Sequence, residues 1–261
     1  IMASASEGEN VEERMGLFWV GGSIGWAIGT GLTGFMLVNF SIHYIFLVTV
    51  ILYMLVVYIS FKAHSDYVYQ TQKVYNVSLF SFILSFIIIF VMFSIDVVKN
   101  LYLPQYYAYY LHTGVPFATV TLSVESFLEI PSIMLFTYLI KGKVKDVKIF
   151  TLSFVLSAMY LIANSLAYNS LTALASMSFY CLVWGSFIVS SSLIVNNLSG
   201  KLKGIGFGTF NALYPLAGII TPLYMGFMIK AFGYRLSLLY LSALPLIAGI
   251  MYYLSWRSLS S

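Results

Sequence analysis

The chain has 261 residues, of which 60% are hydrophobic, 18% aromatic and only 8% charged. Soluble domains carry about 25% charged residues, so this composition excludes an ordinary soluble protein and predicts an integral membrane protein. The net charge of +4 does not indicate nucleic-acid binding, because the 13 lysines and arginines are thinly spread along the chain.

Eight apolar segments are candidates for membrane-spanning helices. A helix needs about 20 apolar residues to cross the hydrocarbon core of a bilayer. None of the segments shows the alternation of a transmembrane β-strand. We therefore predict an all-α polytopic membrane protein, with transmembrane helices at 16–38, 41–61, about 78–103, 117–140, 149–165, 170–195, 204–229 and 236–256.

Lysine and arginine residues are unevenly distributed between the two ends of these helices. If the N-terminal segment is cytoplasmic, only Lys99, Lys230 and Arg235 lie towards the outside, and the other ten of the 13 lie inside. Positive residues favour the cytoplasmic side of a membrane. We therefore predict a multi-pass protein of the plasma membrane with both ends of this chain in the cytoplasm.

Two parts of the sequence resemble each other at an offset of 192 residues. GFMLVNFSIHYIFL, which begins at Gly34, aligns with GFMIKAFGYRLSLL, which begins at Gly226, and the match over 16–47 contains eight identities. Parallel copies of a six-helix half occur in transporters. If the offset relates two such halves, four helices are missing before Ile1. The predicted domains are then a cytoplasmic loop remnant (1–15), the last two helices of the first half (16–61), a cytoplasmic linker (62–77) and the second half (78–261).

Three stretches resemble the major facilitator superfamily. GGSIGWAIGTGLTG resembles its fifth helix, which a short loop joins to an aromatic-rich sixth helix, and GIITPLYMGFMIKAFGYR resembles its eleventh helix. The segment with LYLPQYY and SVESFLEIP is similar to the seventh-to-eighth helix region of sugar efflux transporters. The resemblance implies that the eight predicted helices correspond to helices 5–12 of a twelve-helix fold. It also implies a secondary transporter that works by alternating access, with proton-coupled efflux of a sugar or a drug-like compound.

Two carboxylates, Glu125 and Glu129, interrupt an otherwise apolar predicted helix. They are four residues apart and therefore share one helix face. A charge near the middle of a membrane is costly and usually faces a cavity or a partner, so we predict that both line a substrate or proton pathway. The alternative is a protonated glutamate that is hydrogen-bonded to a neighbouring helix.

Other polar residues in the predicted helices are candidates for the same pathway. Asp96 and Lys99 are three residues apart and can pair, and Asn100 extends their polar face. An interfacial lysine whose ammonium reaches the headgroups is the alternative for Lys99. Asn211 and Tyr214 lie in a proline-interrupted helix of the kind that often lines transport sites, with interhelical hydrogen bonding as the alternative.

Glycines and prolines in the predicted helices are assigned to packing or gating. Small residues let membrane helices approach closely, and proline removes a helix hydrogen bond. The residues assigned to this role are Gly25, Gly29, Gly31, Gly34, Pro131, Pro215 and Pro222. The run YYAYY at 106–110 is predicted to form an interfacial aromatic belt, with a substrate platform as the alternative.

Enzymatic signatures are weak in the sequence. It contains no His-Glu-x-x-His, and its three histidines are scattered. GGSIG at 21–25 fits the formal pattern Gly-x-Ser-x-Gly, but it lies inside a predicted transmembrane helix and not at a strand-to-helix turn. We therefore expect no catalytic residues, no cofactor and no metal, with a small-molecule substrate, protons and the lipid bilayer as partners and no nucleic acid. Two other hypotheses stay open: an inactive or partner-dependent membrane fragment, and, less favoured, an intramembrane enzyme.

Overall fold

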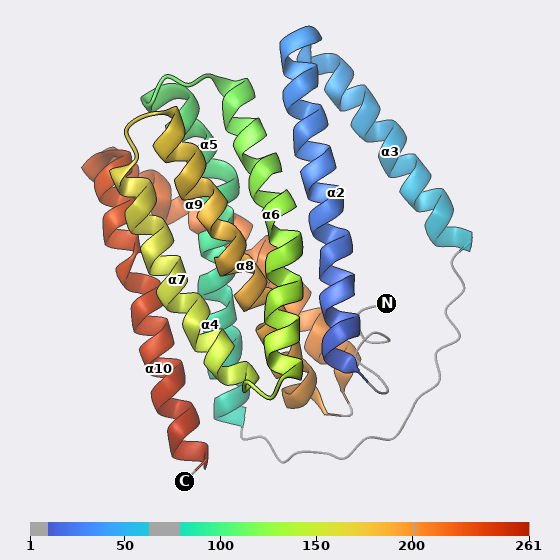
Figure 1. The fold of residues 1–261 in the computed structure, drawn as a ribbon, viewed down its shortest axis with the longest axis vertical. Helices are drawn as coiled ribbons and strands as arrows, with labels where there is room; N and C mark the ends of the chain where they lie inside the picture. The colour runs from blue at the N-terminus through green and yellow to red at the C-terminus, as the bar shows by residue number, and fades with distance from the viewer. Residues whose placement is uncertain (1–9, 63–78, 201, 261) are drawn as a thin grey trace.

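The computed structural model describes residues 10–62, 79–200 and 202–260, and the described chain forms helices without any strand (Figure 1). Most of the predicted loop remnant and of the predicted linker lies outside these residues. The elements, in chain order, are α2 (Val11–Asn39), α3 (Ile42–Lys62), α4 (Leu79–Val97), η1 (Val98–Tyr102), α5 (Leu103–Gln105), η2 (Tyr106–Tyr110), α6 (Val115–Lys141), α7 (Asp146–Leu166), α8 (Ser170–Ser199), α9 (Lys203–Leu241) and α10 (Ala243–Ser260).

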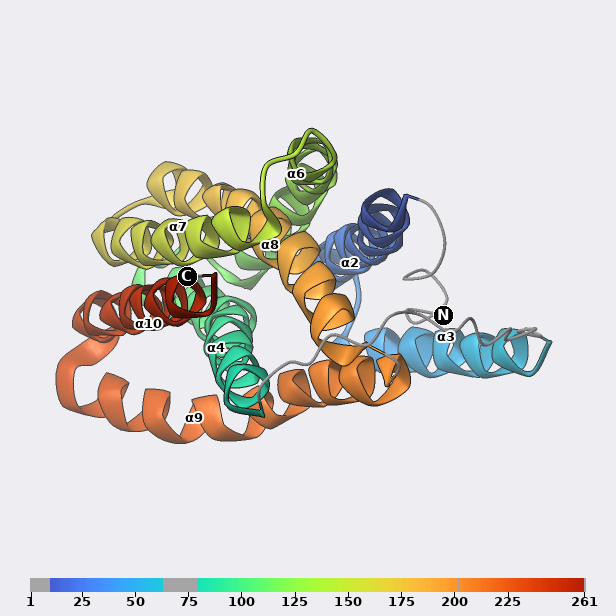
Figure 2. The same cartoon turned by 90° about the horizontal axis from the view of Figure 1, so that it is seen from below.

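Seven helical stretches within the described residues are long and apolar enough to cross a membrane. The all-α class is thus confirmed, and the composition of the helices is consistent with a membrane-embedded protein. The last stretch, 203–255, contains both of the helices predicted at 204–229 and 236–256, so the predicted count of eight is not confirmed. The helical conformation of this stretch is interrupted at Gly233, whose φ is +75°. The chain then turns back, so that α10 runs in the opposite direction to the first part of α9 (Figure 2).

Several boundaries differ from the prediction. α2 begins at Val11, so the segment 11–15, predicted as loop, is helical. The helix predicted at 78–103 continues to Tyr110 through two π-helical segments, η1 and η2. The predicted division of the run 149–200 is confirmed, because α7 ends at Leu166 and α8 begins at Ser170. A capping box starts α8: Thr172 N donates to Asn169 Oδ1 at 2.9 Å, and Asn169 N donates to Thr172 Oγ1 at 3.1 Å.

The helices form a bundle in which successive long helices alternate in direction (Figure 1). α2 packs along α6, α6 against α8, α8 against α7, and α4 against α9 and α10. α3 leans away from the bundle and contacts α2 near the break between the two helices (Figures 1 and 2). Its apolar side chains are exposed, as suits a lipid environment.

Small residues line the contact between α2 and α6. A Cβ atom added to Gly31 would lie 2.8 Å from Ser123 Oγ, and one added to Gly34 would lie 2.6 Å from Thr119 Oγ1. These two glycines therefore permit the close approach of the helices. Around Gly25 and Gly29, by contrast, an added Cβ would meet no described atom within 4 Å.

The break between α2 and α3 matches the break inside α9. Phe40 ends α2 in an extended conformation (φ −135°, ψ 159°), and Ser41 separates it from α3. Gly233, where α9 is interrupted, lies 192 residues after Ser41. The offset of the predicted repeat thus relates two helix–break–helix segments.

The tyrosine run at 106–110 is divided between the core and the surface, where Tyr109 and Tyr110 are exposed. Tyr106 and Tyr107 are fully buried. The Tyr106 hydroxyl donates to Ala167 O at 2.9 Å, and the Tyr107 hydroxyl donates to Asn164 Oδ1. The prediction of an interfacial belt is therefore wrong for these two side chains, because their hydroxyl groups find partners at the end of α7.

Candidate functional site

Four charged residues from two helical stretches meet in the interior, and we call them the buried ion cluster: Asp96, Lys99, Glu125 and Glu129. Lys99 Nζ lies 3.2 Å from Glu125 Oε2 and 3.4 Å from Asp96 Oδ1. The same nitrogen lies 4.0 Å from Glu129 Oε1. Each of the four residues is at most 4% exposed. The two pairs predicted from spacing thus form one cluster, and the interfacial alternative for Lys99 is wrong.

Local backbone geometry brings Asp96 and Lys99 to the same place. Asp96 lies near the end of α4, and Lys99 lies in the π-helical segment η1. A π-helical segment closes i→i+5 hydrogen bonds and often occurs at functional sites. The other side of the cluster comes from α6, where Glu125 and Glu129 are one turn apart.

Neutral polar groups hold Asp96 in place. The Tyr180 hydroxyl donates to Asp96 Oδ1 at 2.9 Å, and Asn100 Nδ2 donates to Asp96 Oδ2 at 2.8 Å. Asn100 Nδ2 also lies 3.2 Å from the hydroxyl of Tyr214, which it reaches across from η1 to α9. Lys99 Nζ lies 4.6 Å from the centroid of the Tyr180 ring, a cation–π distance. Asp96 is therefore fixed on both oxygens.

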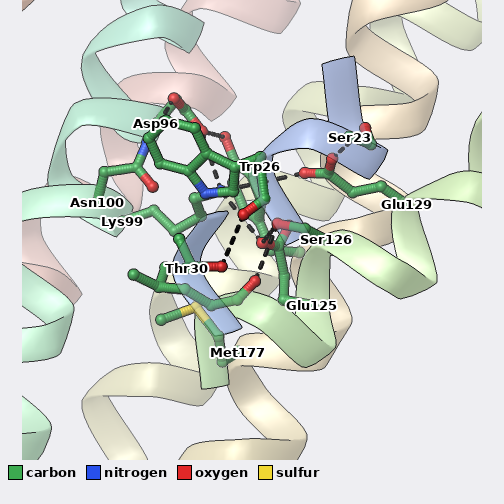
Figure 3. Close-up of polar contacts among 12 residues, drawn as sticks. Ser23, Trp26, Thr30, Asp96, Lys99, Asn100, Glu125, Ser126, Glu129 and Met177 are labelled. Atoms are coloured by element: carbon green, nitrogen blue, oxygen red, sulfur yellow. Dashed lines mark hydrogen bonds and ion pairs between the residues drawn. The ribbon is translucent and has the colours of Figure 1, made fainter. Parts of the chain in front are cut away.

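The two glutamates have different partners. Ser23, on α2, donates to Glu129 Oε2 at 2.5 Å, and Figure 3 shows the two side chains pointing toward each other. Ser126 donates to Glu125 Oε2 at 3.2 Å, whereas Glu125 Oε1 has no hydrogen-bond partner among the described residues. Glu129 is thus hydrogen-bonded to a neighbouring helix, as its predicted alternative requires, while its place in a substrate or proton pathway stays a prediction.

A cavity of about 340 Å³ adjoins the cluster. Its walls come from α2, α4, η1, α6, α8 and α9, so it lies between helices that are far apart in the sequence. The predicted residues Asp96, Lys99, Asn100, Glu129, Asn211 and Tyr214 all line it, together with Trp19, Gly22, Ser23, Trp26, Phe93 and Trp184. Glu125 does not line the cavity, but it pairs with Lys99, which does.

The predicted alternative for Asn211 and Tyr214, interhelical hydrogen bonding, applies to Tyr214 through Asn100. Asn211 Nδ2 donates within its own helix, to Phe207 O at 2.9 Å. Pro131 lies inside α6, and Pro215 and Pro222 lie inside α9. Within the described residues, no group of three or more His, Cys, Asp or Glu side chains is arranged to hold a metal ion.

Sequence reasoning missed the aromatic wall of the cavity. Trp26 lies near the middle of α2, and Trp184 lies near the middle of α8. Tryptophan in a transmembrane helix usually lies at the membrane interface, so these mid-helix positions were a usable signal. Ser23, the polar residue inside the glycine-rich run, was a second signal.

Comparisons with known proteins add no identification. No protein-family model matches the chain, and no curated protein sequence matches it either. Its function is therefore inferred from the geometry of the buried ion cluster and the cavity.

Proposed function

We propose that the protein is a secondary transporter of the major facilitator type, which moves a small solute by alternating access and couples its movement to protons. The observation that carries the proposal is a cavity lined by Asp96, Lys99 and Glu129 inside a bundle of membrane-length helices. Glu129 follows the start of α6 at Val115 by 14 residues and precedes its end at Lys141 by 12. Ionisable groups at such depth are expensive and are typical of substrate and proton pathways.

The position of the cavity supports alternating access. α2 belongs to one proposed half of the transporter, and all other walls of the cavity belong to the second half. The hydrogen bonds that cross this boundary include Ser23 to Glu129 and Ser123 Oγ to Ala27 O at 2.7 Å. Trp19 Nε1 also donates to Ser192 Oγ at 2.9 Å, and Lys141 Nζ donates to Glu13 Oε2 at 2.8 Å. Small residues, among them Gly31 and Gly34, line part of the contact between α2 and α6. A rocking motion of α2 against α6 would rearrange this contact and thereby open or close the cavity.

Glu129 is the proposed link between protons and this motion. As a carboxylate it accepts from Ser23 and faces Lys99 at 4.0 Å. A proton on Glu129 would remove one charge from the cavity wall and would change the hydrogen bond that joins α2 to α6. One protonation event would thus alter both solute binding and the contact between the proposed halves.

The test uses the natural full-length protein in liposomes that contain a pH-sensitive dye. Gradients of a sugar and of a lipophilic cation are applied in turn, and the change in luminal pH is recorded. We expect one solute to drive a pH change, Glu129→Gln to abolish it, and Glu13→Gln to retain it. Glu13 is a suitable control because it pairs with Lys141 at 2.8 Å in an exposed position at the far end of α6.

Two results would count against the proposal. Undiminished proton movement in Glu129→Gln would exclude the role of that residue. A wild-type protein that moves no solute of the panel would favour the inactive or partner-dependent hypothesis.

A further inference from the structure

The charges at the wall of the cavity are unbalanced. Three carboxylates and one ammonium give the buried ion cluster a net charge of −2 when all are ionised. Asp96 and Glu129 line the cavity, and Lys99 is the one lysine or arginine among its described lining residues. We infer that the cavity binds a monovalent organic cation with an aromatic or apolar body. This inference rests on the proposed transport function and names its substrate class.

Lys99 is not available to an anionic ligand. Its ammonium is held by Glu125 at 3.2 Å and by Asp96 at 3.4 Å, and the ring of Tyr180 covers it at 4.6 Å. An anion that approached Lys99 from the cavity would meet the carboxylates of Asp96 and Glu129 in the same wall. The geometry therefore disfavours acidic solutes.

Glu129 is the carboxylate best placed to receive a cation. Both oxygens of Asp96 already accept hydrogen bonds, from Tyr180 and Asn100. Glu129 Oε2 accepts from Ser23, but Oε1 lies 4.0 Å from Lys99 Nζ, which is beyond hydrogen-bond distance. A cationic ligand beside Oε1 would supply the counter-charge that Lys99, shared among three carboxylates, supplies only in part.

The remaining walls suit the body of such a ligand. They carry the aromatic rings of Trp19, Trp26, Phe93, Trp184 and Tyr214. Aromatic faces attract cations, and quaternary ammonium groups are commonly recognised by such rings. A neutral sugar would find aromatic faces and amides here too, but it would leave the negative charge of the cluster uncompensated. The charge therefore favours a cation over the sugar that the sequence resemblance implies.

The cavity accommodates a small organic molecule. At the packing density of protein interiors, about 0.75, a ligand that fills 340 Å³ would itself occupy roughly 250 Å³. This volume admits a ring that carries a trimethylammonium group. A suitable probe pair is para-hydroxyphenyltrimethylammonium and para-tert-butylphenol, which have the same shape and differ in charge.

Tryptophan fluorescence provides the binding assay, because three of the four tryptophans line the cavity. We expect the cationic probe to change the fluorescence of the purified full-length protein saturably, and the neutral probe to bind at least roughly tenfold more weakly. Glu129→Gln should abolish this preference, and the exposed control Glu13→Gln should keep it. Trp26→Leu should weaken binding of the cationic probe. The variant should still fold, because Trp26 is 45% exposed.

Equal binding of the two probes, or binding of methyl β-glucoside in place of the cation, would overturn the inference. An undiminished preference in a folded Glu129→Gln protein, or unweakened binding in Trp26→Leu, would overturn it as well. Failure of the transport proposal is distinguishable, because binding is measured without a membrane gradient. A cation that binds but drives no proton movement in liposomes would overturn the transport function alone. A sugar that drives protons, without any cation binding, would overturn the substrate class alone.

Discussion

Replacement of Lys99 by methionine should destabilise the protein more than replacement of any one carboxylate of the buried ion cluster. Lys99→Met preserves most of the side-chain volume and leaves three buried carboxylates without a cation. Glu125→Gln, by contrast, leaves Lys99 with Asp96 at 3.4 Å and Glu129 at 4.0 Å. The net charge of the cluster becomes −3 in the first variant and −1 in the second.

The distances set the size of the effect. At an effective dielectric constant of about 20, the ammonium attracts Glu125 and Asp96 by about 5 kcal/mol each and Glu129 by about 4 kcal/mol. Desolvation offsets most of this attraction, and the loss of one partner from a buried ion pair typically costs about 3–5 kcal/mol. We expect Lys99→Met to cost about 4 kcal/mol, and Glu125→Gln to cost less than half as much.

The double variant Lys99→Met/Glu125→Gln provides the decisive comparison. It restores the wild-type net charge of −2, so it should be more stable than the sum of the two single losses by about 2 kcal/mol. The assay is thermal unfolding in one detergent, where about 4 kcal/mol corresponds to a decrease in Tm of roughly 10 °C for a chain of this size. An additive cycle, or a smaller loss for Lys99→Met than for Glu125→Gln, would refute the central role of Lys99.

Two further predictions concern packing and an end of the bundle. A Cβ atom at Gly185 of α8 would lie 3.0 Å from the carbonyl carbon of Ser132, which cannot rotate away, so Gly185→Ala should cost about 1–3 kcal/mol in thermal unfolding. An added Cβ at Gly29 meets open space, so Gly29→Ala should not lower stability in the same assay. Equal losses of stability for the two variants would contradict the close contact at Gly185. Arg235 donates to Ala167 O at 3.1 Å and to the Tyr106 hydroxyl at 3.2 Å, and lysine cannot reproduce this fork. Arg235→Lys should therefore accelerate hydrogen exchange at the junction of α7 and α8. An unchanged exchange rate there would show that these two hydrogen bonds do not stabilise the junction.

The sequence was sufficient to predict the all-helical class and the polar pairs within single helices. The spacing of Asp96 and Lys99, and that of Glu125 and Glu129, follows from helix periodicity alone. The sequence could not show that Lys99 also pairs with the glutamates of α6, because this contact depends on how η1 packs against α6. η1 lies within the helix predicted at about 78–103, whereas α5 and η2 continue that helix to Tyr110, beyond the predicted end.

Aromatic residues show the limit of sequence reasoning more clearly. Tyr106 and Tyr107 were placed at the membrane interface because tyrosines at a helix end usually lie there. The structure buries both, since Ala167 O and Asn164 Oδ1 offer acceptors that no local pattern reveals. For the two tyrosines, the deciding factor was a hydrogen-bond partner from a distant part of the chain. Trp26 and Trp184 received no prediction at all, although both line the cavity.

The composition of the buried ion cluster is difficult to explain by stability alone. One carboxylate would neutralise Lys99, and an apolar replacement of such a pair is often neutral or stabilising. The cluster instead contains three carboxylates, and Glu125 Oε1 lacks a hydrogen-bond partner among the described residues. Each additional buried carboxylate adds a desolvation cost and repulsion that Lys99 offsets only in part. A proton or a cationic solute in the adjoining cavity would supply a further counter-charge. Binding of either one would then stabilise the cluster. Because a proton and a cation would neutralise the same carboxylates, binding of one would weaken binding of the other, and this competition would couple the two ligands.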